Sequence, residues 1–200
     1  MARPASFDRD EKLKEAMRLF WRQGYEATSV QDLVDHLGLN RSSLYNAFGG
    51  KHDLYLEALD HYRRAGRRAL QQHLREAPTP IAGIRHAFEA VATQATERQW
   101  GCFVANAAVE CAPRDPDTEA RAADTFEEMR ALFREAVEQA QAAGTVASTR
   151  DPEALGRSLT NAFYGLHLTA KTNPPPSVVD DIVDETIRGL TGPSRSPEAA

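Results

Sequence analysis

The sequence predicts an all-α protein of about nine helices, and three observations support this fold class. Apolar residues recur at three- and four-residue spacings along most of the chain, as the buried face of a helix requires. Glycine, proline or a helix-capping residue separates these periodic segments. No segment shows a convincing strand pattern, and no internal repeat is evident.

The first three predicted helices are short and closely spaced. Residues 8–23 form the first helix, which ends at a glycine. Thr28 or Ser29 can cap the second, whose apolar stripe stops before Gly38. The third occupies residues 40–48, with an asparagine as its N-cap and two glycines after its end.

Longer helices follow, separated by proline-rich breaks. The segments "APTP" at 77–80 and "NPPP" at 173–176 are strong helix breakers, and Asp151 followed by proline is typical of a helix start. We expect a disordered tail over residues 192–200. The remaining helices are expected over residues 51–74, 81–98, 101–111, 117–143, 152–171 and 177–190.

The composition is that of a globular protein with unevenly distributed charge. Of 200 residues, 42% are hydrophobic and 26% charged, and no apolar run approaches the roughly 20 residues that span a membrane. The start of the chain lacks the apolar segment of a signal peptide, so we expect a soluble, cytoplasmic protein without a membrane partner. Residues 1–75 hold 13 Lys/Arg and 10 Asp/Glu, a balance of +3, whereas residues 76–200 hold 11 and 19, a balance of −8. The basic end indicates where a polyanion could dock.

Two helices of about eight residues joined by a glycine turn are typical of a helix-turn-helix, whose second helix enters the DNA major groove. On the helix 40–48, a rotation of about 100° per residue places Arg41, Ser42, Tyr45 and Asn46 within an arc of roughly 140°. Arginine can pair with guanine and asparagine with adenine. The alternative is a plain helical hairpin with a solvated polar face.

The segment "LKEAMRLFWRQGYEATSVQDLVDHLGLNRSSLYNAFGGKHDLYLEAL", residues 13–59, resembles the N-terminal domain of the TetR family of one-component transcriptional repressors. The resemblance implies a DNA-binding domain over 1–50, a connecting helix over 51–76 and a ligand-binding and dimerisation domain over 77–191. It also implies a homodimer on a palindromic double-stranded DNA operator, released by a small-molecule effector. The implied DNA-binding residues are Thr28, Asn40, Arg41, Ser42, Ser43, Tyr45, Asn46 and Lys51.

Among these residues, Thr28 and Lys51 begin helices, whose N-terminal N–H groups suit phosphate. Arg3 could enter the minor groove, or it could belong to a disordered N-terminus. Small polar residues at Asn40 and Ser42–Ser43 replace others often found in the family, so the operator sequence is not predictable.

The C-terminal part is expected to bind the effector and to form the dimer. The resemblance implies a four-helix bundle built from helices 152–171 and 177–190 of two subunits. Because helix 51–74 joins the DNA-binding part to the rest of the chain, we expect it to transmit ligand binding to the DNA. Pockets of this kind are mainly apolar with a few polar groups, which indicates a largely apolar or aromatic ligand. The candidate lining residues are Phe88, Trp100, Cys102, Phe103, Asn106, Met129, Phe133, Phe163, Tyr164 and His167. Each could equally be ordinary core.

Other functions have weaker support in the sequence. Cys102 could be a thiol that senses electrophiles or metals, or simply a small buried apolar residue. The six histidines form no ligand pair at helix spacing with either cysteine. No nucleophile–base set and no phosphate-binding loop is present, so we expect neither an enzyme nor a cofactor. A helical small-molecule carrier or a protein-binding adaptor would share this fold without binding DNA.

Overall fold

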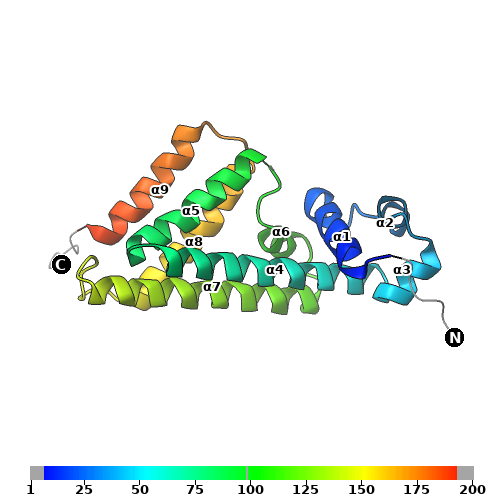
Figure 1. The fold of residues 1–200 in the computed structure, drawn as a ribbon, viewed down its shortest axis with the longest axis horizontal. Coiled ribbons are helices and arrows are strands. Elements are labelled where there is room, and N and C mark those ends of the chain that lie inside the picture. Colours follow the sequence, from blue (N-terminus) through cyan, green and yellow to red (C-terminus); the bar gives the residue numbers. More distant parts are fainter. Residues whose placement is uncertain (1–6, 98, 193–200) are drawn as a thin grey trace. The chain divides into compact units, whose positions relative to one another are not determined.

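The computed structural model describes residues 7–97 and 99–192, apart from the side chains of residues 95–97. Within these residues the chain forms nine α-helices and no strand (Figure 1), which confirms the predicted all-α fold. Arg3 and residues 193–200 of the predicted tail lie outside the described residues.

The nine described helices follow the predicted order, and the ends of each lie close to those expected. Their bounds are α1 Arg9–Gln23, α2 Val30–Leu37, α3 Arg41–Phe48, α4 Lys51–Glu76, α5 Pro80–Glu97, α6 Phe103–Glu110, α7 Pro116–Ala142, α8 Pro152–Ala170 and α9 Pro176–Thr191. Helix α6 begins two residues later than expected because Gly101 has a left-handed φ of 67°. Cys102 therefore precedes the helix instead of lying inside it.

Side-chain caps begin the helices where the sequence offers them. Of the two candidate caps for α2, the structure uses Ser29, which accepts from Asp32 N while the Asp32 carboxylate accepts from Ser29 N at 2.8 Å. The hydrogen bond from the Ser29 hydroxyl, together with that from Ser29 N, lowers the pKa of Asp32. Asp151 caps α8 by accepting from Glu153 N and Ala154 N.

The chain divides into two compact units that do not follow chain order. The first comprises Met1–Gly66 and Phe103–Thr125, and the second comprises Arg67–Cys102 and Phe126–Ala200. Helix α6 and the start of α7 thus belong to the same unit as α1–α3. The domain boundaries expected from the sequence stay a prediction.

Apolar faces of α1–α4 form the core of the first unit. Four leucines are fully buried there: Leu33, Leu44, Leu54 and Leu59. Burial of each leucine side chain stabilises the fold by about 2 kcal/mol. Phe20 packs edge-on against the buried ring of Tyr55, with the ring centroids 5.3 Å apart. This contact packs α1 against α4.

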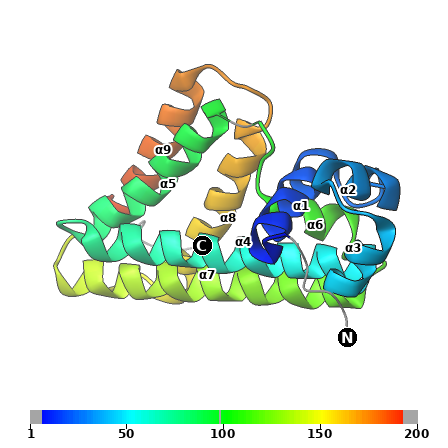
Figure 2. The same ribbon diagram turned by 45° about the vertical axis from the view of Figure 1, so that its right-hand side comes forward.

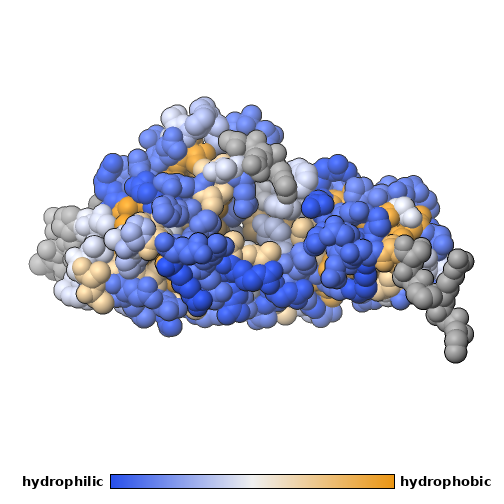
Figure 3. All heavy atoms as spheres, viewed as in Figure 1, coloured by the Kyte–Doolittle hydropathy of each residue, from blue (hydrophilic) through white to orange (hydrophobic). Residues whose placement is uncertain are grey.

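In the second unit α5 packs against α8 and α9 (Figure 2). The rings of Phe88, Phe133 and Phe163 contact one another at centroid distances of 5.5 to 6.0 Å. The surface in Figure 3 is mostly hydrophilic, with scattered hydrophobic patches. Among the described residues, none of the helices has both the length and the apolar character needed to cross a membrane.

Candidate nucleic-acid interface

Helices α2 and α3 are joined by a turn that needs a glycine. Gly38 has φ 62° and ψ 31°, in the left-handed region, and the next residue, Leu39, donates its N–H to the Val34 carbonyl at 3.1 Å. A Cβ at Gly38 would meet nothing within 4 Å, so the backbone conformation selects glycine here. The turn ends α2 and leads directly to the cap of α3.

The start of α3 is held by Asn40, whose side-chain oxygen accepts from Ser43 N at 2.7 Å. Leu44 and Phe48 are buried, while the opposite face of α3 carries exposed side chains that were predicted to bind DNA. These exposed residues are Arg41, Ser42, Tyr45 and Asn46. The spacing argument from the sequence therefore places the polar face correctly.

Tyr45 on α3 and Lys51 at the start of α4 complete the candidate surface. Tyr45 is 49% exposed, and its ring lies against Gly50, where an added Cβ would be 3.5 Å from Tyr45 Cε1. Lys51 is the first residue of α4, and its Nζ lies 4.1 Å from the centroid of the Tyr25 ring. The phenol and the ammonium thus both stand near the α3–α4 turn, where a phosphate oxygen could accept from them.

Thr28 is placed differently from the other candidates. Its side chain is fully buried, and its hydroxyl donates to the Gly24 carbonyl at 2.6 Å. The hydroxyl thereby closes the turn between α1 and α2. A phosphate contact at this position stays a prediction, and it would have to come from the backbone.

The ten candidate ligand-binding residues do not all fall in one unit. Phe103 and Asn106 belong to the first unit and the other eight to the second. In the second unit Phe163 contacts His167 at 5.0 Å between centroids, and Tyr164 contacts Phe126 at 4.7 Å. Burial lowers the pKa of His167 to about 4, so this imidazole is neutral at pH 7.

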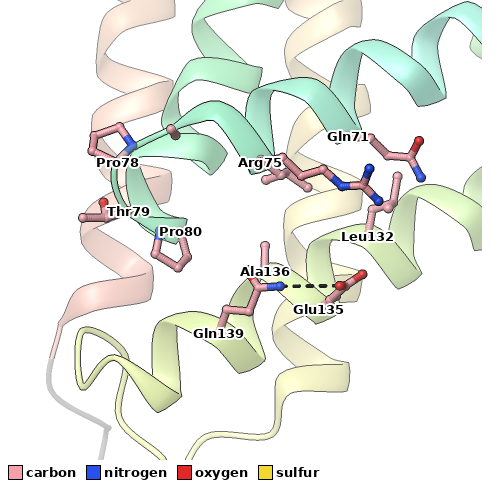
Figure 4. A pocket seen from close by; sticks show the side chains of 11 residues that line it. Gln71, Arg75, Pro78, Thr79, Pro80, Leu132, Glu135, Ala136 and Gln139 are labelled. Atoms are coloured by element: carbon pink, nitrogen blue, oxygen red, sulfur yellow. Dashed lines mark hydrogen bonds between the residues drawn. The ribbon is translucent and has the colours of Figure 1, made fainter.

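A surface cavity of about 330 Å³ lies elsewhere in the second unit, where the α4–α5 turn meets α7 (Figure 4). Gln71 and Arg75 of α4 and Glu135 and Gln139 of α7 form its polar rim, and Leu132 contributes apolar surface. Gln139 donates to Glu135 at 3.4 Å. None of the residues predicted to line the effector pocket lines this cavity.

Both cysteines are buried, and neither forms a disulfide within the described part of the chain. Cys111 accepts a hydrogen bond from Tyr55 Oη at 3.4 Å, and burial raises the pKa of both groups. A thiol with a raised pKa is a poor nucleophile at neutral pH.

One set of potential metal ligands comes together only in three dimensions. His52, Asp115 and Asp117 have side-chain ligand atoms within 4.8 Å of one another. Asp115 already caps α7, because it accepts from Thr118 Oγ1 at 2.5 Å and from Asp117 N at 3.2 Å. Sequence spacing could not reveal this cluster, because His52 is separated from the two aspartates by more than 60 residues.

Family comparisons agree with the geometry of both parts of the chain. The family model described as "Bacterial regulatory proteins, tetR family" matches residues 13–58, and the one described as "Tetracyclin repressor-like, C-terminal domain" matches residues 80–184. The second match alone covers more than half of the chain. The protein belongs to the TetR family and is a DNA-binding transcriptional regulator, as the sequence predicted.

Several relatives are similar over almost their full length. The uncharacterized HTH-type transcriptional regulator YezE of Bacillus subtilis (strain 168) is 32% identical, over 95% of this chain and 100% of its own. The HTH-type transcriptional repressor ComR of Escherichia coli (strain K12) is 31% identical, over 93% and 90%. A structure of the TetR family regulator CifR, a cysteine mutant complexed with a 26-bp double-strand operator DNA, superposes with a TM-score of 0.85 at 30% identity, over 94% and 100%.

Proposed function

We propose that the protein is a repressor that binds a palindromic operator as a homodimer and leaves it when a small, largely apolar or aromatic effector binds. The observation that carries this proposal is the exposed polar face of α3 in a chain of the TetR family. The relative ComR is named a repressor, and CifR was solved on operator DNA. Such a regulator acts on chromosomal DNA, which places it in the cytoplasm and requires neither enzymatic activity nor a cofactor.

The candidate side chains on and beside α3 divide into two groups by their chemistry. Arg41, Ser42 and Asn46 can donate to base edges, whereas Tyr45 and Lys51 can donate to phosphates. Three further residues hold the helix starts in place: Asn40 caps α3, Ser43 donates to that cap, and Thr28 closes the preceding turn.

A single reading helix contacts few base pairs, so specific binding needs two helices held by a dimer. We propose that the exposed faces of α8 and α9 form this dimer. Leu168 on α8 is 69% exposed and Val178 on α9 is 39% exposed. Gly156 packs inside the subunit, because an added Cβ would lie 3.1 Å from Arg134 Cβ, whereas an added Cβ at Gly165 would meet open space. Light scattering on Leu168→Glu, with wild type as reference, tests this surface; a variant that stays dimeric contradicts it.

The effector would occupy the interior of the second unit, among the aromatic rings around Phe163. Its binding releases DNA only through a difference in affinity between the two conformations of the protein. A thermal-shift screen of hydrophobic and aromatic compounds, followed by DNA release, tests this pocket. A screen without any stabilising compound contradicts the apolar ligand class.

DNA binding is tested by fluorescence anisotropy with DNA from the upstream intergenic region, across a salt series. We expect affinity to fall steeply with salt, and Lys51→Ala to reduce the slope of log K against log salt by about 1. Tyr45→Phe should weaken binding without changing this slope, because no charge is lost. The control for Arg41→Ala is Arg68→Ala, which also removes one exposed arginine, but from the second unit. Equal losses in these two variants contradict base reading by α3.

A thiol sensor at Cys102 is the alternative mode of regulation. The side chain is 5% exposed and directly precedes α6. If Cys102→Ser leaves the response to quinones and aldehydes unchanged, thiol sensing is excluded. A carrier or adaptor function instead predicts that no DNA is bound and that Tyr45→Ala has no effect.

A further inference from the structure

The last residue of α6 holds the turn that begins the helix-turn-helix. The Glu110 carboxylate accepts from Tyr25 N at 3.2 Å through Oε2 and from Glu26 N at 2.9 Å through Oε1. Two successive backbone N–H groups therefore point at one carboxylate, an arrangement that proteins use to bind anions. The contact joins residues 84 and 85 positions apart in the sequence.

Gly24, which precedes these two amides, leaves room for the Glu110 carboxylate. Gly24 has φ 90°, a conformation that other residues adopt at a cost. A Cβ at this position would lie 2.9 Å from both Glu110 oxygens. Glycine thus serves the contact twice, through its backbone angle and through the space it leaves.

The position of Glu110 is unfavourable for its own helix. A carboxylate in the last turn faces the negative end of the helix dipole, which usually costs a few tenths of a kcal/mol or more. The two charge-assisted hydrogen bonds to the turn outweigh this local cost. The glutamate is therefore explained by its contact with the turn and not by the stability of α6.

The held turn leads directly to a residue of the proposed DNA surface. The Tyr25 ring lies 4.6 Å from the ring of Tyr55 and 4.1 Å from Lys51 Nζ. Tyr55 in turn donates to Cys111, the residue after Glu110. Glu110 and Cys111 consequently contact both the α1–α2 turn and α4.

We propose that Glu110 is a positioning residue that sets the geometry of α2, α3 and Lys51 for DNA, and that α6 acts on DNA affinity through this carboxylate. The inference rests on the proposed DNA-binding function. The chain passes from the second unit to the first between Cys102 and Phe103, immediately before α6.

Three full-length variants test the proposal. Glu110→Ala removes both acceptors, Glu110→Gln keeps one oxygen acceptor in the same shape, and Val109→Ala changes the neighbouring residue, which is 82% exposed. We expect Glu110→Ala to raise the operator Kd about tenfold and to speed exchange of the Tyr25 and Glu26 amide hydrogens by about tenfold or more. Glu110→Gln should give a Kd and exchange rates between those of wild type and of Glu110→Ala. Val109→Ala should match wild type in both.

A second comparison separates positioning from general stability. If Glu110 acts through the reading surface, the loss caused by Glu110→Ala should shrink in a Lys51→Ala background, whereas independent effects would add. Additive losses, or a Glu110→Ala variant with wild-type Kd and wild-type exchange, overturn the proposal. Should Glu110→Ala fail to fold, the same measurements on Glu110→Gln, alone and with Lys51→Ala, decide by the same criteria. If wild type binds no DNA, the proposed function fails, and the exchange rates still show whether Glu110 holds the turn.

Discussion

The ammonium group of Lys51 lies 4.1 Å from the centroid of the Tyr25 ring, so the first residue of α4 is held against the turn that follows α1. A cation over an aromatic face is attracted by the negative charge density of the ring. This contact orders a long, flexible side chain before DNA arrives. A phosphate contact made by Lys51 would then cost less side-chain entropy.

Removing the ring should weaken DNA binding. We expect Tyr25→Leu to raise the operator Kd about threefold, because an exposed cation–π contact is worth about 0.5–1 kcal/mol. Tyr25→Phe keeps the ring and should bind as wild type does. Anisotropy titrations at one salt concentration measure both. Equal Kd values for the Leu and Phe variants would show that the ring contact is irrelevant to binding.

The first residue of α1 ties the three-helix core together. Arg9 donates to both oxygens of Glu57 at 2.7 Å and to the Ala47 carbonyl at 3.1 Å. We expect Arg9→Ala to lower the free energy of unfolding by about 1 kcal/mol, the range for a well-oriented pair that is partly exposed. Lys14→Ala, which breaks only the exposed pair with Glu11, should lower the free energy of unfolding clearly less than Arg9→Ala does. Urea denaturation gives both values, and equal losses would contradict a special role for Arg9.

Stability should fall in mild acid because of His167. Burial lowers its pKa from 6.5 to about 4, so between these values the unfolded chain binds a proton that the folded chain does not. This contribution leaves stability intact above about pH 6.5 and reduces it as pH falls toward 4, by up to about 3 kcal/mol. His167→Gln should flatten the profile, while His86→Gln, an exposed histidine on α5, should not. Denaturation from pH 4 to 7 measures this, and an unchanged slope in His167→Gln would exclude the assignment.

Cys111 should behave as an unreactive thiol. Its raised pKa and its burial both reduce the amount of accessible thiolate at pH 7. In a Cys102→Ser background, we expect iodoacetamide to modify Cys111 at least about tenfold more slowly in the folded than in the urea-unfolded protein. Mass spectrometry follows the reaction. Modification at similar rates in both states would contradict the buried environment.

Local features of the fold were accessible from the sequence because each depends on residues within one or two helical turns. Ser29, Asn40 and Asp151 cap their helices by contacts two or three residues ahead. Apolar spacing likewise identified the buried Leu44 and Phe48, and so the exposed face of α3. The TetR-like order of these residues then led to the family and to DNA binding.

Three other features needed the structure. The hydroxyl of Thr28 lies inside its turn, although its position in the sequence suggested a phosphate contact. Helix α6 belongs to the unit that contains the helix-turn-helix, which chain order does not reveal. The pairing of Lys51 with Tyr25 depends on how α4 packs against the preceding turn.

The sequence by itself determined the helices, the caps of α3 and α8 and the polar face of α3, because periodicity and capping are local and repeat along the chain. The family followed from the resemblance of residues 13–59 to the TetR N-terminal domain. Only the tertiary structure decided that Glu110 meets the backbone of Tyr25 and Glu26 and that Tyr55 meets Cys111. Such contacts join residues 56 to 85 positions apart, and nothing in the local spacing marks either partner. They arise when whole helices pack, and that packing minimises exposed apolar surface over the entire unit.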